Sequence, residues 1–166
     1  VQAVSVNPID IKLRKGAGTL SHPRVLGFDA ASVVRAVGSE VNGFSVGDEV
    51  WHSGNRDRPG TYSQFTLVDS RIVSKRPPSL SIAEAASLPL TALTSWEALI
   101  DHIRLGTPEE RSNKAFLMIG GAGGVGSAAI QLARAITSGP VVATSSRPES
   151  AQWCQDMGAT GIINHR

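Results

Sequence analysis

The second half of the chain holds a glycine-rich stretch whose spacing suits phosphate binding. Gly121, Gly123 and Gly126 fit the pattern G-x-G-x-x-G within FLMIGGAGGVGSAAIQLA, residues 116–133. The stretch opens with an apolar, strand-like run and ends in a helical pattern, which is the context that this motif requires. Glycines there allow a tight turn, the approach of a pyrophosphate and close helix packing, while free N–H groups at the helix start bind phosphate. We therefore predict a dinucleotide-binding loop formed by Gly121, Ala122, Gly123, Gly124, Val125 and Gly126.

Two other structures can use glycines in this way. A mononucleotide P-loop would carry a Lys-Ser or Lys-Thr pair after its last glycine, and no such pair follows Gly126. A strand-to-helix turn that needs glycine only for packing stays open as the alternative.

The residues after the next predicted strand indicate which dinucleotide binds. NAD sites usually carry an acidic residue about 20 positions after the glycine motif, where it accepts hydrogen bonds from the ribose hydroxyls. The strand here ends in Ser145, Ser146 and Arg147, with no carboxylate at its tip. Two hydroxyls and a guanidinium suit the 2′-phosphate of NADP, which needs donors and positive charge. We predict NADPH as the cofactor; the alternative is that Arg147 is a solvated surface arginine.

The elements around this loop predict half of a doubly wound parallel sheet. Strands are expected at AFLMIG, VVATSS and GIIN, which begin at residues 115, 141 and 161. Helices are expected at residues 124–137, where apolar residues recur at helical spacing, and at residues 149–157, where Gly158 suits the C′ position. Strand and helix thus alternate as in a Rossmann fold.

The first half of the chain predicts mainly β structure. VQAVSV is an alternating strand followed by the turn signal NPID, and ASVVRAVGSEV and GDEVWHS are rich in β formers. RDRPGTYSQFTLVDSRIVS places a Pro-Gly turn before another alternating strand, so a small barrel-like β domain is expected. Ser81 and Glu84 form a capping box that starts a helix. Thr94 and Glu97 repeat that spacing and predict a second helix over residues 95–103, before a polar loop at residues 104–114.

Composition argues against several functional classes. The net charge of the 166 residues is only +2 and no basic run occurs, so nucleic-acid binding is not expected. No apolar run approaches the roughly 18 residues of a membrane span. The only cysteine, Cys154, allows no intrachain disulfide and fits a reducing cytoplasm; we expect a buried, inert thiol. Because the chain lacks an initial Met and stops shortly after GIIN, we expect a piece of a longer protein.

Several motifs, in sequence order, resemble one enzyme superfamily. They are AVSVNPID, GFDAASVVRAVGSEVNGFSVGDEV, GTYSQFTLVD and AASLPLTALTSWEAL. Together they resemble the medium-chain dehydrogenase/reductase superfamily, and most closely its zinc-independent, quinone oxidoreductase-like branch, some of whose members are named zinc-type alcohol dehydrogenase-like. The resemblance implies a GroES-like β-barrel catalytic domain over residues 1–90, without its first strands. It also implies an NAD(P)-binding Rossmann domain over residues 91–166, without its C-terminal half, and a homodimeric full-length protein.

The positions that bind zinc in metal-dependent members carry other residues here. The matching positions hold Asn7, Phe28 with Asp29, and Leu90. Zinc needs three N, S or O ligands, and the other potential ligands lack ligand spacing: they are His22, His52, Asp29 and Asp57. We therefore predict no metal. Without a Lewis acid, a substrate that spreads negative charge is favoured, and hydride addition to an enone or quinone gives such an enolate or phenolate.

The resemblance also implies roles for individual side chains. Asn7 matches the family's active-site Asn, whose amide can donate to a substrate oxygen; an Asx turn beside proline is the alternative. Thr94 matches a threonine beside the nicotinamide, or it only caps the second helix. Tyr62, the only tyrosine, is a candidate proton donor, or it packs in a turn. A substrate cleft is expected from Phe28, Asp29 and Trp51, and the two aromatic residues are core residues in the alternative interpretation.

One function and two alternatives follow from these predictions. The chain is expected to come from an NADPH-dependent oxidoreductase that transfers hydride to a quinone or an α,β-unsaturated carbonyl without zinc, with solvent or Tyr62 supplying the proton. The first alternative is an NADPH-binding sensor or scaffold without turnover, and the second is an NADP-dependent alcohol dehydrogenase. Since half of the Rossmann sheet is expected to be missing, the 166 residues alone are predicted to be inactive.

Overall fold

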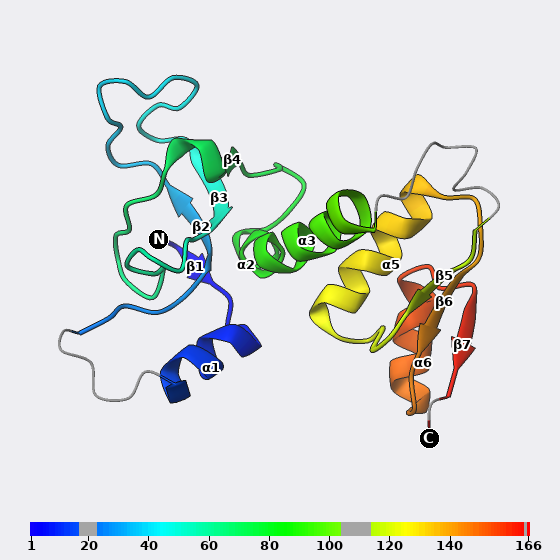
Figure 1. Cartoon of the computed structure of the whole chain (residues 1–166). Helices are drawn as coiled ribbons and strands as arrows, with labels where there is room; N and C mark the ends of the chain where they lie inside the picture. The colour runs from blue at the N-terminus through cyan, green and yellow to red at the C-terminus, as the bar shows by residue number, and fades with distance from the viewer. Residues whose placement is uncertain (17–22, 104–113, 165) are drawn as a thin grey trace. The chain divides into compact units, whose positions relative to one another are not determined.

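The computed structural model describes residues 1–16, 23–103, 114–164 and 166 (Figure 1). His22 and the predicted polar loop, apart from its last residue, lie outside these ranges. The chain divides into two compact units, Val1–Leu90 and Thr91–Arg166, each with its own sheet. Within the described ranges, no helix has both the length and the apolar character needed to cross a bilayer.

The first unit is built on an antiparallel sheet, which confirms the predicted β structure. In sheet order its strands are β1 (Ala3–Val4), β2 (Asp29–Val33), β3 (Glu49–Ser53) and β4 (Val73–Lys75). Helix α2 (Ile82–Ser87) packs on β2 through a buried cluster of Ala31, Ala85 and Ala86. The predicted capping box of Ser81 and Glu84 is present at the start of α2.

The Asn-Pro stretch starts a helix, so the predicted turn there is wrong. Helix α1 spans Pro8–Gly16. Proline is favoured at the first helical position because its missing N–H would have no helical partner anyway. The backbone N–H of Asn7 donates to Asp10 Oδ2 at 2.9 Å, which is one half of a capping box. A turn signal and a helix start therefore share the same residues here.

The second predicted helix begins earlier than the Thr94 and Glu97 spacing indicates. Helix α3 spans Pro89–Trp96 and continues as a π-helical segment over Glu97–His102. Thr94 lies inside α3, so its predicted capping role is wrong. The helix starts at Pro89 instead, and the next N–H, that of Leu90, donates to Asp29 Oδ1 at 2.8 Å. This partner lies on a distant strand, which local spacing does not reveal.

Only the last part of the strand predicted after the Pro-Gly turn is regular β structure. β4 is preceded by a 3₁₀ turn, Ser70–Ile72, whose Arg71 N–H donates to Asp69 Oδ1 at 3.0 Å. Before that turn, Phe65 is 71% and Leu67 is 89% exposed. Their alternating apolar side chains therefore do not pack on the core, and the pattern does not produce a longer strand.

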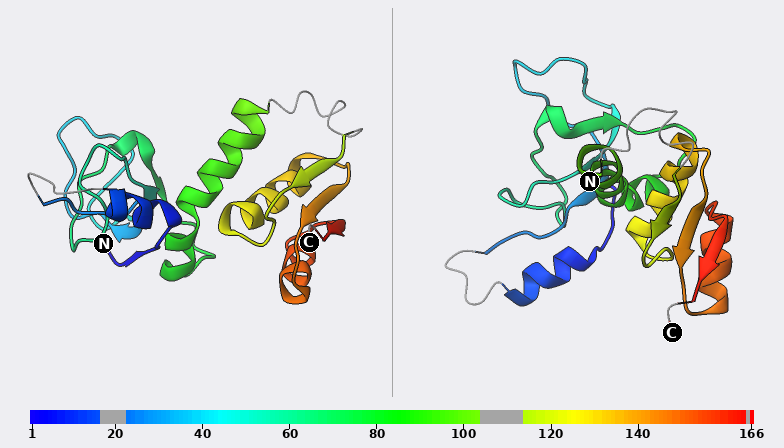
Figure 2. Two further views of the ribbon diagram at one scale, coloured as in Figure 1. Left: turned by 60° about the horizontal axis from the view of Figure 1, so that its bottom comes forward. Right: turned by 45° about the vertical axis from the view of Figure 1, so that its right-hand side comes forward.

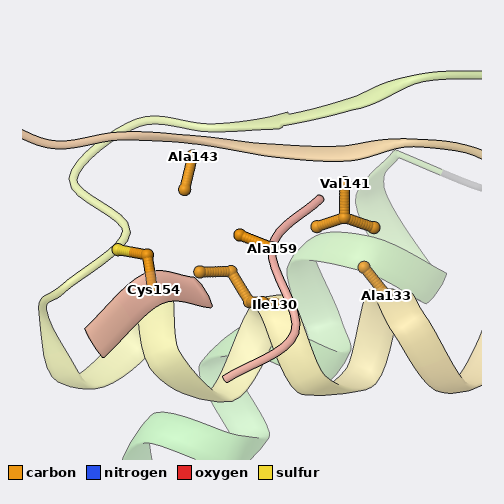
Figure 3. Close-up of a cluster of buried hydrophobic side chains, with 6 residues drawn as sticks. All are labelled: Ile130, Ala133, Val141, Ala143, Cys154 and Ala159. Carbon is orange, nitrogen blue, oxygen red and sulfur yellow. The ribbon is translucent and has the colours of Figure 1, made fainter. Parts of the chain in front are cut away.

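The second unit is the predicted half of a doubly wound sheet. Its parallel strands β5 (Phe116–Met118), β6 (Val141–Thr144) and β7 (Gly161–Ile163) neighbour each other in chain order, connected by α5 (Gly124–Ile136) and α6 (Pro148–Asp156) (Figure 2). Right-handed crossovers in this order place both helices on one face of the sheet. Ile130 of α5 and Cys154 of α6 accordingly share one buried cluster with Val141 and Ala143 of β6 (Figure 3).

Two details of this unit match the sequence-based expectations. Gly158 follows α6 with φ of +109°, as expected for a C′ residue. Cys154 is fully buried, and burial raises the pKa of its thiol, so little reactive thiolate forms.

Candidate functional site

The glycine loop connects β5 to α5 and is shaped by close packing. A Cβ at Gly126 would lie 2.5 Å from the carbonyl oxygen of Gly120. A Cβ at Gly121 would lie 2.7 Å from Ala143 Cβ and 2.9 Å from Cys154 Sγ. The packing of the protein itself therefore requires these two glycines. At Gly123 the nearest atom to an added methyl group would be 3.5 Å away, so this position is open on the protein side.

The first turn of α5 is available to an anion. Gly123 is the N-cap residue and has no side chain to form a cap, and among the described residues no side-chain cap bonds the first N–H groups of the helix. The helix dipole adds a positive potential at this end. The loop residues around this turn are exposed: Ala122, Gly123, Gly124 and Val125. The arrangement suits a phosphate group.

A buried serine on α3, which the sequence did not indicate, fixes the start of α5. Ser95 is fully buried, and its hydroxyl lies 2.7 Å from the Thr91 carbonyl oxygen and 3.0 Å from that of Val125. A Cβ at Gly124 would lie 3.0 Å from Thr91 Cγ2. α3 is therefore in close contact with the glycine loop, which explains why Gly124 is also small.

The predicted ribose end of the site lies beside this loop, at the tip of β6. Thr144 Oγ1 accepts a hydrogen bond from Gly120 N at 2.9 Å, and Thr144 O accepts one from Gly121 N at 3.2 Å. Ser145 follows directly and is only 6% exposed, whereas Arg147 is exposed. The structure thus brings residues 145–147 and the glycine loop to the same edge of the sheet.

A carboxylate also lies at this tip, which the sequence-based prediction missed. Arg147 Nε is 3.2 Å from Glu149 Oε1, and the two side chains are 69% and 71% exposed. An exposed pair of this kind contributes only about 0–1 kcal/mol. Arg147 also lies 3.4 Å from Ser150 Oγ. These contacts are weak enough for a phosphate to replace Glu149 as the partner of Arg147.

In the first unit, Asn7 is held by a buried polar network. The residue is 8% exposed, and Nδ2 donates to Asp29 Oδ2 at 2.8 Å and to Ser5 Oγ at 3.1 Å. The Ser5 hydroxyl in turn donates to Asp29 Oδ2 at 2.6 Å. Asn7 therefore caps α1 through its backbone and contacts a buried carboxylate through its side chain. The capping role of Asn7 and its predicted donor role are thus compatible.

Asp29 is the centre of this network. The residue is fully buried, and besides Ser5 and Asn7 it binds the backbone of Leu90 through Oδ1. Burial raises the pKa of Asp29, while the hydrogen bonds from Ser5, Asn7 and Leu90 act in the opposite direction and the nearby Asp10 carboxyl raises it further. Asp29 therefore faces protein donors in the described unit, and its predicted place in a substrate cleft stays a prediction.

Tyr62 completes the network on the side of α1. Its hydroxyl lies 2.8 Å from Asp10 Oδ2 and 3.1 Å from the Ser5 carbonyl oxygen, and Asp10 is 3% exposed. Burial and the hydrogen bond to Asp10 raise the pKa of Tyr62 to about 12. A phenol with so high a pKa gives up its proton less readily than a free tyrosine does.

The remaining predicted site residues have mixed positions. Trp51 packs against the buried cluster of the first unit, as its core alternative predicts, and Phe28 is half-buried just before β2. Thr94 is exposed on α3. The contacts of the described residues do not test the roles of Phe28 and Thr94 beside a substrate or nicotinamide.

Among the described residues, no group of three or more His, Cys, Asp or Glu side chains is arranged to hold a metal ion. Asn7 and Asp29 hydrogen-bond to each other, and the matching positions Phe28 and Leu90 offer no side-chain ligand. His52 is buried beside an apolar cavity of about 330 Å³, without a hydrogen-bond partner for either ring nitrogen among the described residues. Burial lowers the pKa of His52 to about 4, so the ring is neutral near pH 7.

Comparison with known proteins relates both units to oxidoreductases. Residues 1–78 match the family described as the alcohol dehydrogenase GroES-like domain. A zinc-type alcohol dehydrogenase-like protein of Staphylococcus aureus (strain COL) is 44% identical over 167 residues, covering 100% of this chain and 50% of the relative. The 2-methylene-furan-3-one reductase of Solanum lycopersicum is 38% identical over 174 residues, covering 99% of this chain and 43% of the relative.

A solved structure supports the same relationship. The Escherichia coli quinone oxidoreductase complexed with NADPH is 29% identical and superimposes with a TM-score of 0.81, covering 98% of this chain and 48% of that one. The fold expectation is confirmed: a GroES-like unit is followed by the first half of a Rossmann sheet. The chain spans about half the length of the curated relatives it matches.

Proposed function

Because the chain belongs to the medium-chain dehydrogenase/reductase superfamily, with a GroES-like domain over residues 1–78, we propose that it is part of an NADPH-dependent oxidoreductase. The proposed reaction is hydride transfer to a quinone or an α,β-unsaturated carbonyl without zinc. The names of the tomato reductase and the E. coli quinone oxidoreductase support this substrate class, and the NADPH in the latter supports the cofactor.

The observation that carries the proposal is the exposed, uncapped start of α5 beside the tip of β6. Backbone N–H groups at Gly124–Gly126 would hold the pyrophosphate, and the open Gly123 would let it approach. Ser145, Ser146 and Arg147 would hold the 2′-phosphate. When bound, the cofactor supplies the hydride.

Asn7 is the proposed donor to the substrate oxygen. Hydride addition to the electrophilic carbon of an enone or quinone moves negative charge onto that oxygen, and a prepositioned N–H stabilises the charge. The proton that completes the reduction would come from solvent, because the hydroxyl of Tyr62 is bonded to Asp10 and its pKa is about 12. Thr94 is proposed to lie beside the nicotinamide, as the superfamily relationship implies.

We expect Arg147→Ala to weaken NADPH binding about tenfold or more and to leave NADH binding nearly unchanged, because a charge-assisted bond to phosphate contributes about 1.5–3 kcal/mol. Nicotinamide fluorescence titration of the full-length protein measures both constants. Arg134→Ala, in the last turn of α5, is the matched control for loss of a basic residue. Equal binding of both cofactors before and after the substitution would identify Arg147 as a surface residue and remove the case for NADP.

We expect Tyr62→Phe to keep most of kcat and the shape of the pH–rate profile. The substitution should lower the free energy of unfolding by about 1 kcal/mol, because the buried carboxyl of Asp10 loses a partly buried hydrogen bond. Steady-state kinetics from pH 6 to 9 and urea unfolding measure the two effects. A large loss of kcat, with little loss of stability, would instead make Tyr62 the proton donor.

An NADP-dependent alcohol dehydrogenase is the competing candidate, and the name of the S. aureus relative favours it. Such an enzyme would oxidise simple alcohols with NADP, whereas the proposed reductase would oxidise NADPH only with quinones or enones. Binding of NADPH with turnover of neither substrate class would point to a sensor or scaffold. The superfamily relationship also leads us to propose a homodimeric, cytoplasmic full-length protein, which sedimentation and cell fractionation would check.

A further inference from the structure

Asp29 is a fully buried carboxylate with no ion pair among the described residues. A buried carboxylate without a cation is costly, and burial here raises its pKa. The cost must be offset by hydrogen bonds, and the three donors come from two segments: Ser5 and Asn7 lie between β1 and α1, and the backbone of Leu90 lies in α3. Because Asp29 is a hydrogen-bond acceptor, each of these neighbours must turn a hydrogen-bond donor toward it.

For Asn7 this constraint fixes the orientation of the side-chain amide. The oxygen and nitrogen ends of an amide have almost the same shape, so packing alone does not distinguish them. Asp29 accepts hydrogen bonds at both oxygens, from Leu90 N at Oδ1 and from the Ser5 hydroxyl at Oδ2, as a carboxylate that only accepts does. Since Asp29 Oδ2 lies 2.8 Å from the amide, the nitrogen end of Asn7 must face it.

The same geometry allows one amide hydrogen to serve two acceptors. Ser5 Oγ and Asp29 Oδ2 are only 2.6 Å apart, so both lie on one side of Asn7 Nδ2, where a single hydrogen can reach both. Besides these two oxygens, the nitrogen has no hydrogen-bond partner among the described residues. It belongs to an amide that already donates to a negative group, and Asn7 retains 8% exposure.

We infer that Asp29 is a positioning residue, whose carboxylate orients Asn7 so that one N–H serves both Asp29 and Ser5 and the second N–H is directed to the substrate oxygen. This inference rests on the proposed reductase function and adds a specific role for a residue that would not touch the substrate. Through Leu90 the same carboxylate also holds the first turn of α3. If Asp29 were only a structural anchor, it would need the bond to Leu90, but the orientation of the Asn7 amide would not matter.

An exchange of the two side chains separates orientation from anchoring. In the double variant Asn7→Asp/Asp29→Asn, an amide at position 29 can donate to a carboxylate at position 7 and accept from Leu90 N. The network is thereby retained, while the group presented to the substrate oxygen becomes an acceptor with negative charge. We expect the double variant to recover most of the thermal stability lost in Asp29→Asn, with kcat at least about 100-fold below the wild type. The KM for NADPH should stay within about twofold.

The outcomes of this exchange in the full-length protein are distinct. Recovery of kcat together with stability would overturn the inference and make Asp29 a structural anchor. If the wild-type protein turns over neither quinones nor enones, the proposed function fails, and ¹H–¹⁵N spectra of the Asn7 side chain then decide the inference. The two amide proton signals of Asn7 are assigned by their loss in Asn7→Ala. Signals that are widely separated in the wild type and converge in Asp29→Asn would support the inference. No change in their separation would overturn it.

Discussion

Gly126→Ala is expected to lower the free energy of unfolding of the second unit by about 3 kcal/mol and to abolish detectable NADPH binding. A methyl group there would lie 2.5 Å from the Gly120 carbonyl oxygen and 2.6 Å from that of Gly121. Both contacts are with backbone, so no side chain can rotate away, and the cost should reach the upper part of the range for overpacking. Urea unfolding and fluorescence titration of the full-length protein measure the two effects.

Gly123→Ala is the matched variant that separates the ligand from the fold. Its φ of −75° suits alanine, and the nearest atom to the new methyl group would be 3.5 Å away, so the unfolding midpoint should stay close to that of the wild type. A pyrophosphate approaching the backbone would meet the methyl group, and we expect NADPH to bind at least about tenfold more weakly. Normal NADPH binding to this variant would show that the loop is a packing turn.

The second unit could be predicted well because its signals are local. The apolar run, the glycine spacing and the helical stripe follow one another in the chain, and each fixes the next element. Gly158 shows the same principle, since a left-handed residue after a helix is a local requirement. Glu149 could not be predicted from the strand tip alone, because it lies beyond that tip and the first turn of α6 brings its side chain back to Arg147.

The first unit was predicted less well because distant partners decide its local structure. The Asn-Pro pair predicts a turn, yet a helix starts there. This start is stabilised by Asp10, which is hydrogen-bonded to Tyr62, 52 positions away. The start of α3 depends on Asp29, which is 61 positions before Leu90. The resemblance to the superfamily predicted Asn7 and Asp29 as site residues. The spacing of these residues does not indicate that they hydrogen-bond to each other.

Asn7→Ala is expected to reduce kcat by about 100-fold or more, as removal of a single donor to a developing oxyanion typically does. The KM for NADPH should change little, because the residues proposed to bind the cofactor lie in the other unit. Stability should fall by about 1–3 kcal/mol, since Asp29 loses one of its buried donors. Steady-state kinetics with a quinone and with an enone, well below the unfolding temperature, measure the catalytic effect.

Two controls make this result specific to the amide. Asn42→Ala removes an exposed Asn whose Nδ2 donates to the Glu40 carbonyl oxygen of its own loop, and it should leave kcat and stability unchanged. Ser5→Ala removes another donor to Asp29 and should cost similar stability, but because Asn7 still faces the carboxylate, kcat should fall far less than in Asn7→Ala. Equal losses of kcat in Ser5→Ala and Asn7→Ala would mean that activity follows the integrity of the network. The amide of Asn7 would then have no specific part in stabilising the substrate oxygen.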